Sequence, residues 1–242
     1  MTSLKATNLI STISGVVLIL LVSVFLLANA PLCAQEKKSG SKQEKQAKED
    51  QSWDELEQWA EQAFIDQKPK EARKLWMKAL LTAQDNGEEL HAATTLNQLN
   101  HLFVQEKEYE KAFLALTQAL EIRSRLLGKD NLLTSETMGN LALINHKLGH
   151  DLEAEELYKK ALEIKDKSLG KHSPQSAITL HNLAELKSKH RQYSEAKELF
   201  ERVKEIDARE YGDSHVEVVR DLISLGINSF RCHKWQESVD YF

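Results

Sequence analysis

The feature that most constrains this chain is a repeat with a period of 42 residues. Ala112, Ala154, Ala196 and Ser238 stand at that spacing. A leucine or an aromatic residue follows four positions after each of them, and a glycine follows sixteen positions after the first three. A further unit precedes them around Ala72 at a slightly shorter spacing. Five units, the last incomplete, predict a repeat architecture in which each unit packs mainly on its neighbours.

Each unit is predicted to contain two amphipathic helices. In the fourth unit, apolar residues recur every three to four positions over 177–190 and again over 194–209, with the short polar turn "HRQY" between the two segments. Gly170 and Gly212 follow second helices and suit the left-handed conformation that ends a helix. Pro174 follows a serine and suits the first turn of the next helix.

Small residues at fixed positions explain how the two helices of a unit approach each other. A large side chain at Ala154 or Ala196 would hold antiparallel helices apart, whereas Tyr158 and Phe200 fill the neighbouring space. A single helical hairpin cannot bury its apolar stripe, but stacked hairpins share one continuous core. We therefore expect an all-α chain that forms a curved solenoid of antiparallel helix pairs.

The repeated residues resemble the tetratricopeptide repeat. Leu141-Ala142, Ala154, Tyr158 and Ala161 follow its pattern of a leucine and a small residue, then alanine, aromatic residue and alanine. The 42-residue length and the stretch "LGKHSPQSAITLHNLAEL" are similar to the repeats of kinesin light chains. The resemblance covers residues 52–242. It implies a right-handed superhelical solenoid whose first helices line a concave groove for a protein or an extended peptide.

By this resemblance, thirteen inward-facing side chains on the first helices form the predicted groove. Their amides could hold the backbone of an extended peptide, because an amide both donates and accepts hydrogen bonds. Alternatively, Asn140 and Asn182 bond between helices. Chaperone-binding repeats hold a terminal carboxylate with lysines on the inner face. No lysine occupies the matching positions here, which are Glu57, Asn97, Gly139 and His181, so a carboxylate clamp of that kind is not predicted. The predicted groove residues are Asn97, His101, Gln105, Asn140, Leu143, His146, Lys147, His181, Asn182, Glu185, Lys189, Ile227 and Arg231.

The first 34 residues form a targeting segment. One basic residue, Lys5, precedes an apolar stretch that ends in small residues, which is typical of a secretory signal, with cleavage favoured after Ala34. The alternative is a single-pass membrane anchor over 10–30. Both hypotheses place the remainder outside the cytoplasm, either released into the periplasm or extracellular space or attached to the membrane. Residues 35–51 are rich in charge and are interpreted as a flexible linker.

The sequence contains no recognisable catalytic motif and predicts no cofactor. His146 and His150 stand four apart, as helical metal ligands do, but no third ligand is evident and no metal site is predicted. Cys232 is interpreted as a small packing residue. The net charge of −5 and the lack of a basic stripe argue against nucleic-acid binding.

The leading hypothesis is therefore a non-enzymatic scaffold. The alternatives are a membrane-tethered adaptor and the interaction portion of a larger protein or enzyme complex. Because the sequence stops within the second helix of its last unit, three alternatives stay open: a truncated sequence, a longer form that continues into another domain, or an uncapped end that is covered by self-association.

Overall fold

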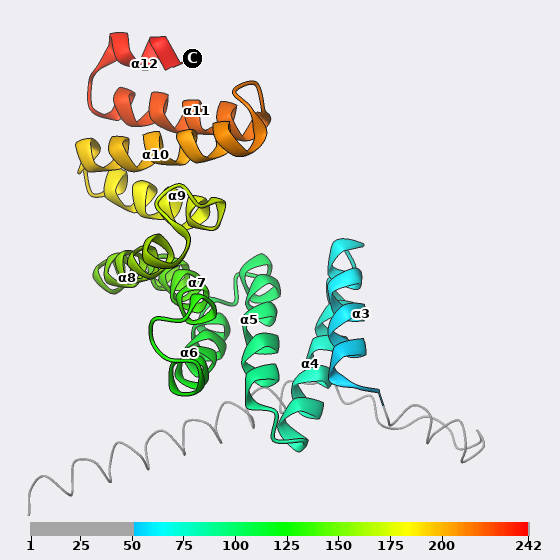
Figure 1. The fold of residues 1–242 in the computed structure, drawn as a ribbon. Coiled ribbons are helices and arrows are strands. Elements are labelled where there is room, and N and C mark those ends of the chain that lie inside the picture. The colour runs from blue at the N-terminus through cyan, green and yellow to red at the C-terminus, as the bar shows by residue number, and fades with distance from the viewer. Residues whose placement is uncertain (1–50, 242) are drawn as a thin grey trace, which may run out of the picture.

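The computed structural model describes residues 51–241, and this part of the chain is entirely helical (Figure 1). Its helices pair in sequence, each first helix antiparallel to the second helix of the same unit. The all-α prediction is confirmed. The helices are α3 (Trp53–Ile65), α4 (Pro69–Asp85), α5 (Glu89–Gln105), α6 (Tyr109–Leu126), α7 (Leu132–Leu148), α8 (Asp151–Leu169), α9 (Pro174–Lys189), α10 (Tyr193–Tyr211), α11 (Val216–Arg231) and α12 (Trp235–Tyr241).

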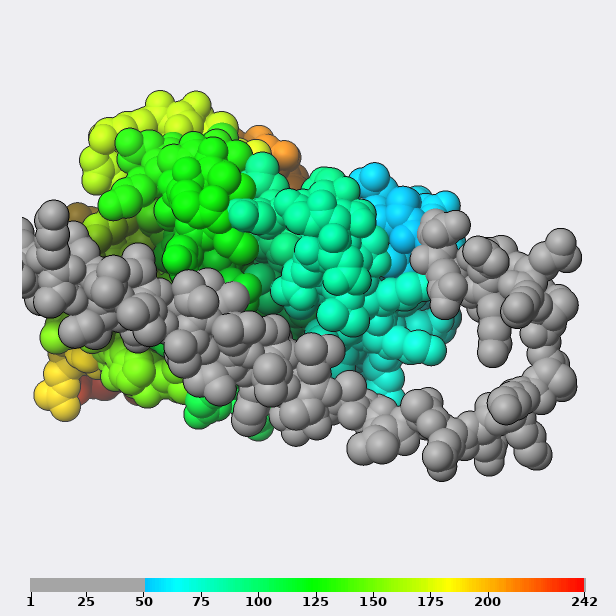
Figure 2. Space-filling model, turned by 90° about the horizontal axis from the view of Figure 1, so that it is seen from below, coloured from blue at the N-terminus to red at the C-terminus, as the bar shows by residue number. Residues whose placement is uncertain are grey.

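The pairs stack into a right-handed solenoid, as predicted. Each second helix packs on the first helix of the next unit, as α6 does on α7 and α10 on α11. First helices of neighbouring units also touch, α5 with α7 and α7 with α9, which places them on the inner side of the curve. The first and last units lie at opposite ends of the described chain (Figure 1), and from below the middle units cover most of the last unit (Figure 2).

The repeated small and aromatic residues form the core at the helix crossings. Ala112, Ala154 and Ala196 are fully buried. Tyr158 and Phe200 are buried beside them, as the column pattern predicts. A fully buried side chain of this size contributes about 1.5–3 kcal/mol through removal of apolar surface from water, so the apolar columns supply much of the stability of each unit.

The helices start and end at the predicted proline and glycine signals, with one difference in backbone conformation. Pro174 opens α9, and Gly149 ends α7 in the left-handed conformation. Gly170 and Gly212 have the predicted positive φ, but their ψ values of 157° and 153° belong to an extended region instead of the left-handed helix. That region is accessible essentially to glycine alone. Cys232, interpreted from the sequence as a small packing residue, lies just beyond the end of α11.

The segment predicted to be a signal or an anchor lies outside the described residues, as does nearly all of the predicted linker. Within residues 51–241, no helix combines the length and the apolar character that a membrane crossing requires.

Candidate functional site

All thirteen predicted groove residues lie on the first helices α5, α7, α9 and α11. They do not form one uniform surface, however. Some are held by hydrogen bonds within the chain, some are exposed, and two line a distinct cavity near the C-terminal end of the described residues.

The two asparagines nearest the middle of the solenoid connect neighbouring units. Asn140 Nδ2 donates to Asn97 Oδ1 at 3.1 Å, which joins α7 to α5. Asn97 is buried and donates in turn to Glu136 at 3.2 Å. For Asn140, the alternative of a bond between helices is therefore correct. Asn182, the corresponding residue of the next unit, instead lines the cavity.

A second group of predicted residues gathers around Asp151 at the start of α8. Lys189 Nζ donates to the carboxylate of Asp151 at 2.8 Å, and the rings of His146 and His190 contact it at 2.7 and 2.8 Å. Burial would raise the pKa of Asp151, but these three partners outweigh it and hold the pKa well below its usual value. The polar groups of this cluster are therefore bonded to one another, and the cluster joins the first helices α7 and α9 to the second helix α8.

The two histidines considered as metal ligands do not converge. His150 Nδ1 approaches Asn145 Oδ1 at 3.4 Å, whereas His146 contacts Asp151. Among residues 51–241, no group of three or more His, Cys, Asp or Glu side chains is arranged so that it could hold a metal ion.

Several of the remaining predicted residues face solvent and are available to a partner. Leu143 is half-buried against the core, and Arg231 donates to Ser188 at 3.3 Å while remaining largely exposed. The exposed residues of the predicted groove also include His101, Gln105, Lys147, Glu185 and Ile227.

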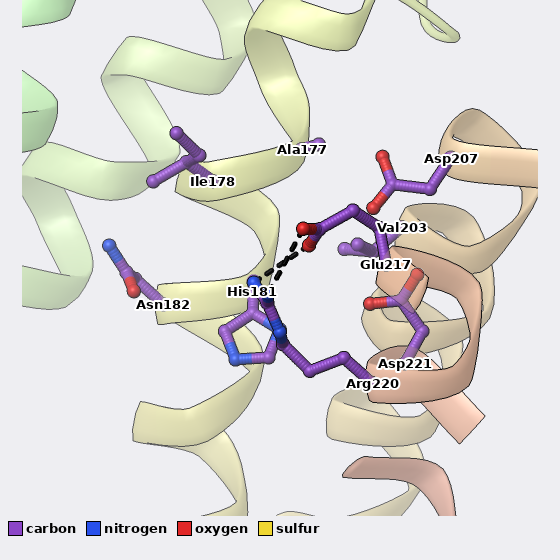
Figure 3. Close-up of a pocket in the computed structure, with 9 residues that line it drawn as sticks. All are labelled: Ala177, Ile178, His181, Asn182, Val203, Asp207, Glu217, Arg220 and Asp221. Atoms are coloured by element: carbon purple, nitrogen blue, oxygen red, sulfur yellow. Dashed lines mark hydrogen bonds and ion pairs between the residues drawn. The ribbon is translucent and has the colours of Figure 1, made fainter. Parts of the chain in front are cut away.

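A polar cavity of about 200 Å³ lies between α9, α10 and α11 (Figure 3). His181 and Asn182 on α9 form one side, and acidic side chains from α10 and α11 form the other. Apolar contacts come from Ala177, Ile178 and Val203. The remaining lining residues are Asp207, Glu217, Arg220 and Asp221.

The carboxylate of Asp221 is the most buried charged group of the cavity. Its residue is only 3% exposed, and within the described chain Oδ2 has no hydrogen-bond partner. Burial raises the pKa of Asp221 to about 7, and the charge of Asp207 adds to the rise. Burial and the charge of Glu217 likewise raise the pKa of Asp207. These acidic side chains therefore hold protons more tightly than ordinary aspartates.

The one arginine of the cavity, Arg220, pairs with the third acid, Glu217, and its charge only partly offsets the rise in the pKa of Asp207. Arg220 pairs with Glu217 at 2.7 Å, and His181 Nε2 lies 3.6 Å from Glu185. The ring of His181 also packs edge-on against Phe200. Asp207 and Asp221 thus remain without a cationic side chain bonded to them in this part of the chain.

Sequence reasoning missed the acidic residues of this cavity, although the repeat contained a signal for them. Asp207 stands 42 residues after Lys165, and Asp221 stands 42 residues after Thr179. The apolar residues at the repeated positions continue without interruption through this unit. At these two polar positions, by contrast, the residue changes from lysine to aspartate and from threonine to aspartate. A break of that kind in a regular repeat marks a position with a local role.

The architecture defines a class: an α-solenoid of stacked helix pairs whose first helices form the inner face. Residues 93–167 and 152–207 match the family model of the tetratricopeptide repeat. The chain is a tetratricopeptide repeat protein, as the resemblance implied. No curated protein matches it in sequence.

Solved structures share the fold at low sequence identity. BtubC (BKLC) from P. vanneervenii is 22% identical, with a TM-score of 0.67 over 78% of this chain and 76% of that chain. Kinesin-light-chain-like repeats from Podosopora anserina are 20% identical, with a TM-score of 0.65 over 77% and 89%. PilF of Pseudomonas aeruginosa is 20% identical, with a TM-score of 0.56 over 78% and 73%. At these identities the likeness establishes the fold.

Proposed function

We propose that this chain is a non-enzymatic scaffold that binds a protein or an extended peptide on the inner face formed by its first helices. Tetratricopeptide repeats act generally in protein–protein interaction, which fixes the class of function. The main observation that supports binding on the inner face is the cavity between α9, α10 and α11. It combines a buried carboxylate that has no hydrogen-bond partner with apolar walls. Binding sites commonly combine apolar walls with a few directed polar groups.

The exposed groove residues extend this surface along the solenoid. Lys147 and Glu185 supply charges of opposite sign on α7 and α9, and Ile227 supplies an apolar contact on α11. An extended partner that lies across these helices would meet alternating polar and apolar side chains. Affinity would then come from several modest contacts together with the cavity.

The scaffold acts outside the cytoplasm in this proposal. The composition of residues 1–34 supports export, with cleavage after Ala34 or retention as an N-terminal anchor. Intact-mass measurement of the native protein separates the two forms. A chain that begins at Gln35 in the soluble fraction indicates cleavage, and a chain that retains Met1 in the membrane fraction indicates an anchor.

The inner face is tested by site-specific photo-cross-linking in the native cell. A photoreactive residue is placed at Ile178 on α9, and the matched control is placed at Leu152 on α8, since the two side chains are similarly exposed, at 76% and 83%. We expect a discrete cross-linked protein from Ile178 and none from Leu152. A product from Leu152 alone would move the binding surface to the second helices and contradict the proposal.

A further inference from the structure

The acidic cavity occupies a position that holds a buried cation in the two preceding units. We call each contact between a second helix and the following first helix a junction. At the α6–α7 junction, Arg123 Nη1 donates to the Leu133 carbonyl at 2.9 Å and to Thr137 Oγ1 at 2.8 Å. Arg123 is only 3% exposed.

The α8–α9 junction repeats this arrangement with a lysine. Lys165 Nζ donates to the Gln175 carbonyl at 2.9 Å and to Thr179 Oγ1 at 2.9 Å. Lys165 is buried as well. Arg123 and Lys165 are 42 residues apart, as are their carbonyl and hydroxyl partners. The fold therefore builds the same small cation site twice, and each time the cation comes from the second helix.

At the α10–α11 junction the same register brings three acidic residues together. Asp207 replaces the cation, Asp221 replaces the threonine, and Glu217 stands at the position of Gln175. All three line the cavity, with Asp207 on α10 and the other two on α11 (Figure 3). The junction thus keeps the sequence register of the cation site and gains negative charge, but it has no cation at the second-helix position, and Arg220 on α11 pairs with Glu217.

We propose that this cavity binds the ammonium or guanidinium group of a lysine or arginine side chain from a protein partner. The proposal rests on the proposed function, because it specifies what the inner face recognises. Asp221 Oδ2 is buried without a nitrogen or hydroxyl donor, and only a proton shared with Asp207 can bond the two carboxyl groups, so an incoming cation would satisfy both acids in their ionised form. The apolar side chains of Ala177 and Val203 beside the acids suit the aliphatic stem of such a side chain.

Charge on every packed element supports a cationic occupant. Asp207 on α10 faces Asp221 and Glu217 on α11, while Arg220 on α11 is bound to Glu217 and His181 on α9 lies beside Glu185. The raised pKa of Asp221 means that a proton partly fills the role of the cation near neutral pH. A bound ammonium would displace that proton, so affinity should rise as the pH increases from 6 to 8.

The experiment follows the side-chain carboxyl and backbone signals of the full-length labelled chain by nuclear magnetic resonance. The probes are the blocked peptides acetyl-Ala-Lys-Ala-amide and acetyl-Ala-Arg-Ala-amide, with the methionine and glutamate analogues as controls. We expect saturable shifts at Asp207 and Asp221 with the basic peptides only. Asp221→Asn should weaken binding about tenfold or more, in keeping with the loss of a buried charge partner. The matched control Asp213→Asn removes an exposed acid on the nearby turn and should leave binding unchanged.

Three outcomes would overturn the proposal. Equal weakening by Asp213→Asn would show attraction by overall charge. Binding that appears only in Arg220→Gln would show that Arg220 of the chain itself fills the cavity. Stronger binding of Ca²⁺ than of either basic peptide would assign the acids to a metal ion instead.

A double substitution separates this inference from the proposed function. Asp207→Lys with Asp221→Thr recreates the α8–α9 arrangement at α10–α11, so it should abolish peptide binding while the chain remains folded by circular dichroism. If basic peptides fail to bind the wild type but the cross-link at Ile178 persists, the scaffold stands and the inference fails. If basic peptides bind and no cross-link forms at Ile178, the inference stands without support for the wider surface.

Discussion

The α8–α9 and α10–α11 junctions share a sequence register and differ in the sign of their buried charge. Lys165 is held by a carbonyl and a hydroxyl in the first, whereas Asp207 and Asp221 share the corresponding space in the second. Both junctions keep their alanine and aromatic columns. The difference shows that the repeated apolar residues specify this fold. The repeated polar residues can reverse their charge without changing the fold.

A second buried carboxylate, Glu57 at the other end of the described chain, shows what makes the cavity distinctive. Glu57 accepts hydrogen bonds from Trp76 Nε1 and Thr95 Oγ1, both at 3.2 Å. Burial raises its pKa to about 7, the same value as for Asp221. A raised pKa therefore does not identify a binding group. Asp221 differs from Glu57 in that no donor of residues 51–241 reaches its Oδ2 atom, so contacts of that kind do not offset its burial.

The largest effect is expected when the α8–α9 junction, in which the buried lysine is hydrogen-bonded, is given an acidic residue like those of the α10–α11 junction. Lys165→Asp removes two hydrogen bonds and leaves a buried carboxylate facing the Gln175 carbonyl. We expect a loss of about 3 kcal/mol in the free energy of unfolding, since breaking a buried polar contact strands the groups that remain. Urea denaturation followed by circular dichroism measures the change.

The matched control for this change is Lys160→Asp on the same helix. Lys160 is exposed and pairs with Glu156 on the surface, so its replacement should have a much smaller effect. If the two variants lost similar stability, the Lys165 contacts would not be what holds the α8–α9 junction.

The reverse conversion should stabilise the last junction. Asp207→Lys with Asp221→Thr removes two neighbouring carboxylates and supplies a donor that can reach the Glu217 carbonyl and the new hydroxyl. We expect a gain of about 1–2 kcal/mol at pH 8, because an uncompensated buried charge is replaced by satisfied hydrogen bonds. A net loss in urea denaturation would mean that the two junctions differ in backbone geometry as well as in charge.

The fold was predictable because its determinants are local and repeated. The spacing of Ala112, Ala154 and Ala196 predicted the helix crossings, and Pro174 marked a helix start. The extended conformation of Gly170 was not predictable from the glycine alone, because a positive φ fits two different values of ψ. Helix periodicity fixes which face is buried but not the torsions of a turn.

The groove was predictable only to the level of the helix face. The resemblance placed all thirteen residues on first helices, but it could not show that Asn140 bonds to Asn97 or that Lys189 bonds to Asp151. Those contacts depend on the rotation between units, which no pattern within one helix encodes. Asp207 escaped prediction because it lies on a second helix and reaches the inner face only through the α10–α11 contact.

Stability as a function of pH separates the acidic junction from the rest of the chain. Since folding raises the pKa of Asp221, the folded chain binds a proton more tightly than the unfolded chain, and the associated stability is lost as the pH rises toward 7. Asp221→Asn removes this dependence. Relative to the wild type, we expect the variant to gain about 1–2 kcal/mol between pH 5 and pH 8.

Urea denaturation of both proteins at several pH values measures this difference. Subtraction of the two curves cancels the histidines common to both proteins, His181 among them. Parallel curves would contradict a raised pKa at Asp221 and would indicate that water reaches its carboxylate.

The smallest expected change in stability comes from two substitutions at corresponding positions, and these two substitutions should differ in the sign of their effect. Thr179→Val keeps the shape of the side chain but removes one acceptor of Lys165, which retains the Gln175 carbonyl. This should cost about 1 kcal/mol, the typical value of one hydrogen bond. Asp221→Leu, at the corresponding position, removes a buried carboxylate that has no donor, so stability should stay the same or increase at pH 8. Urea denaturation of the two variants side by side decides the point. Losses of the same sign and size would show that Asp221 is as well satisfied as Thr179, and the α10–α11 cavity would then be a packing defect with no need of a partner's cation.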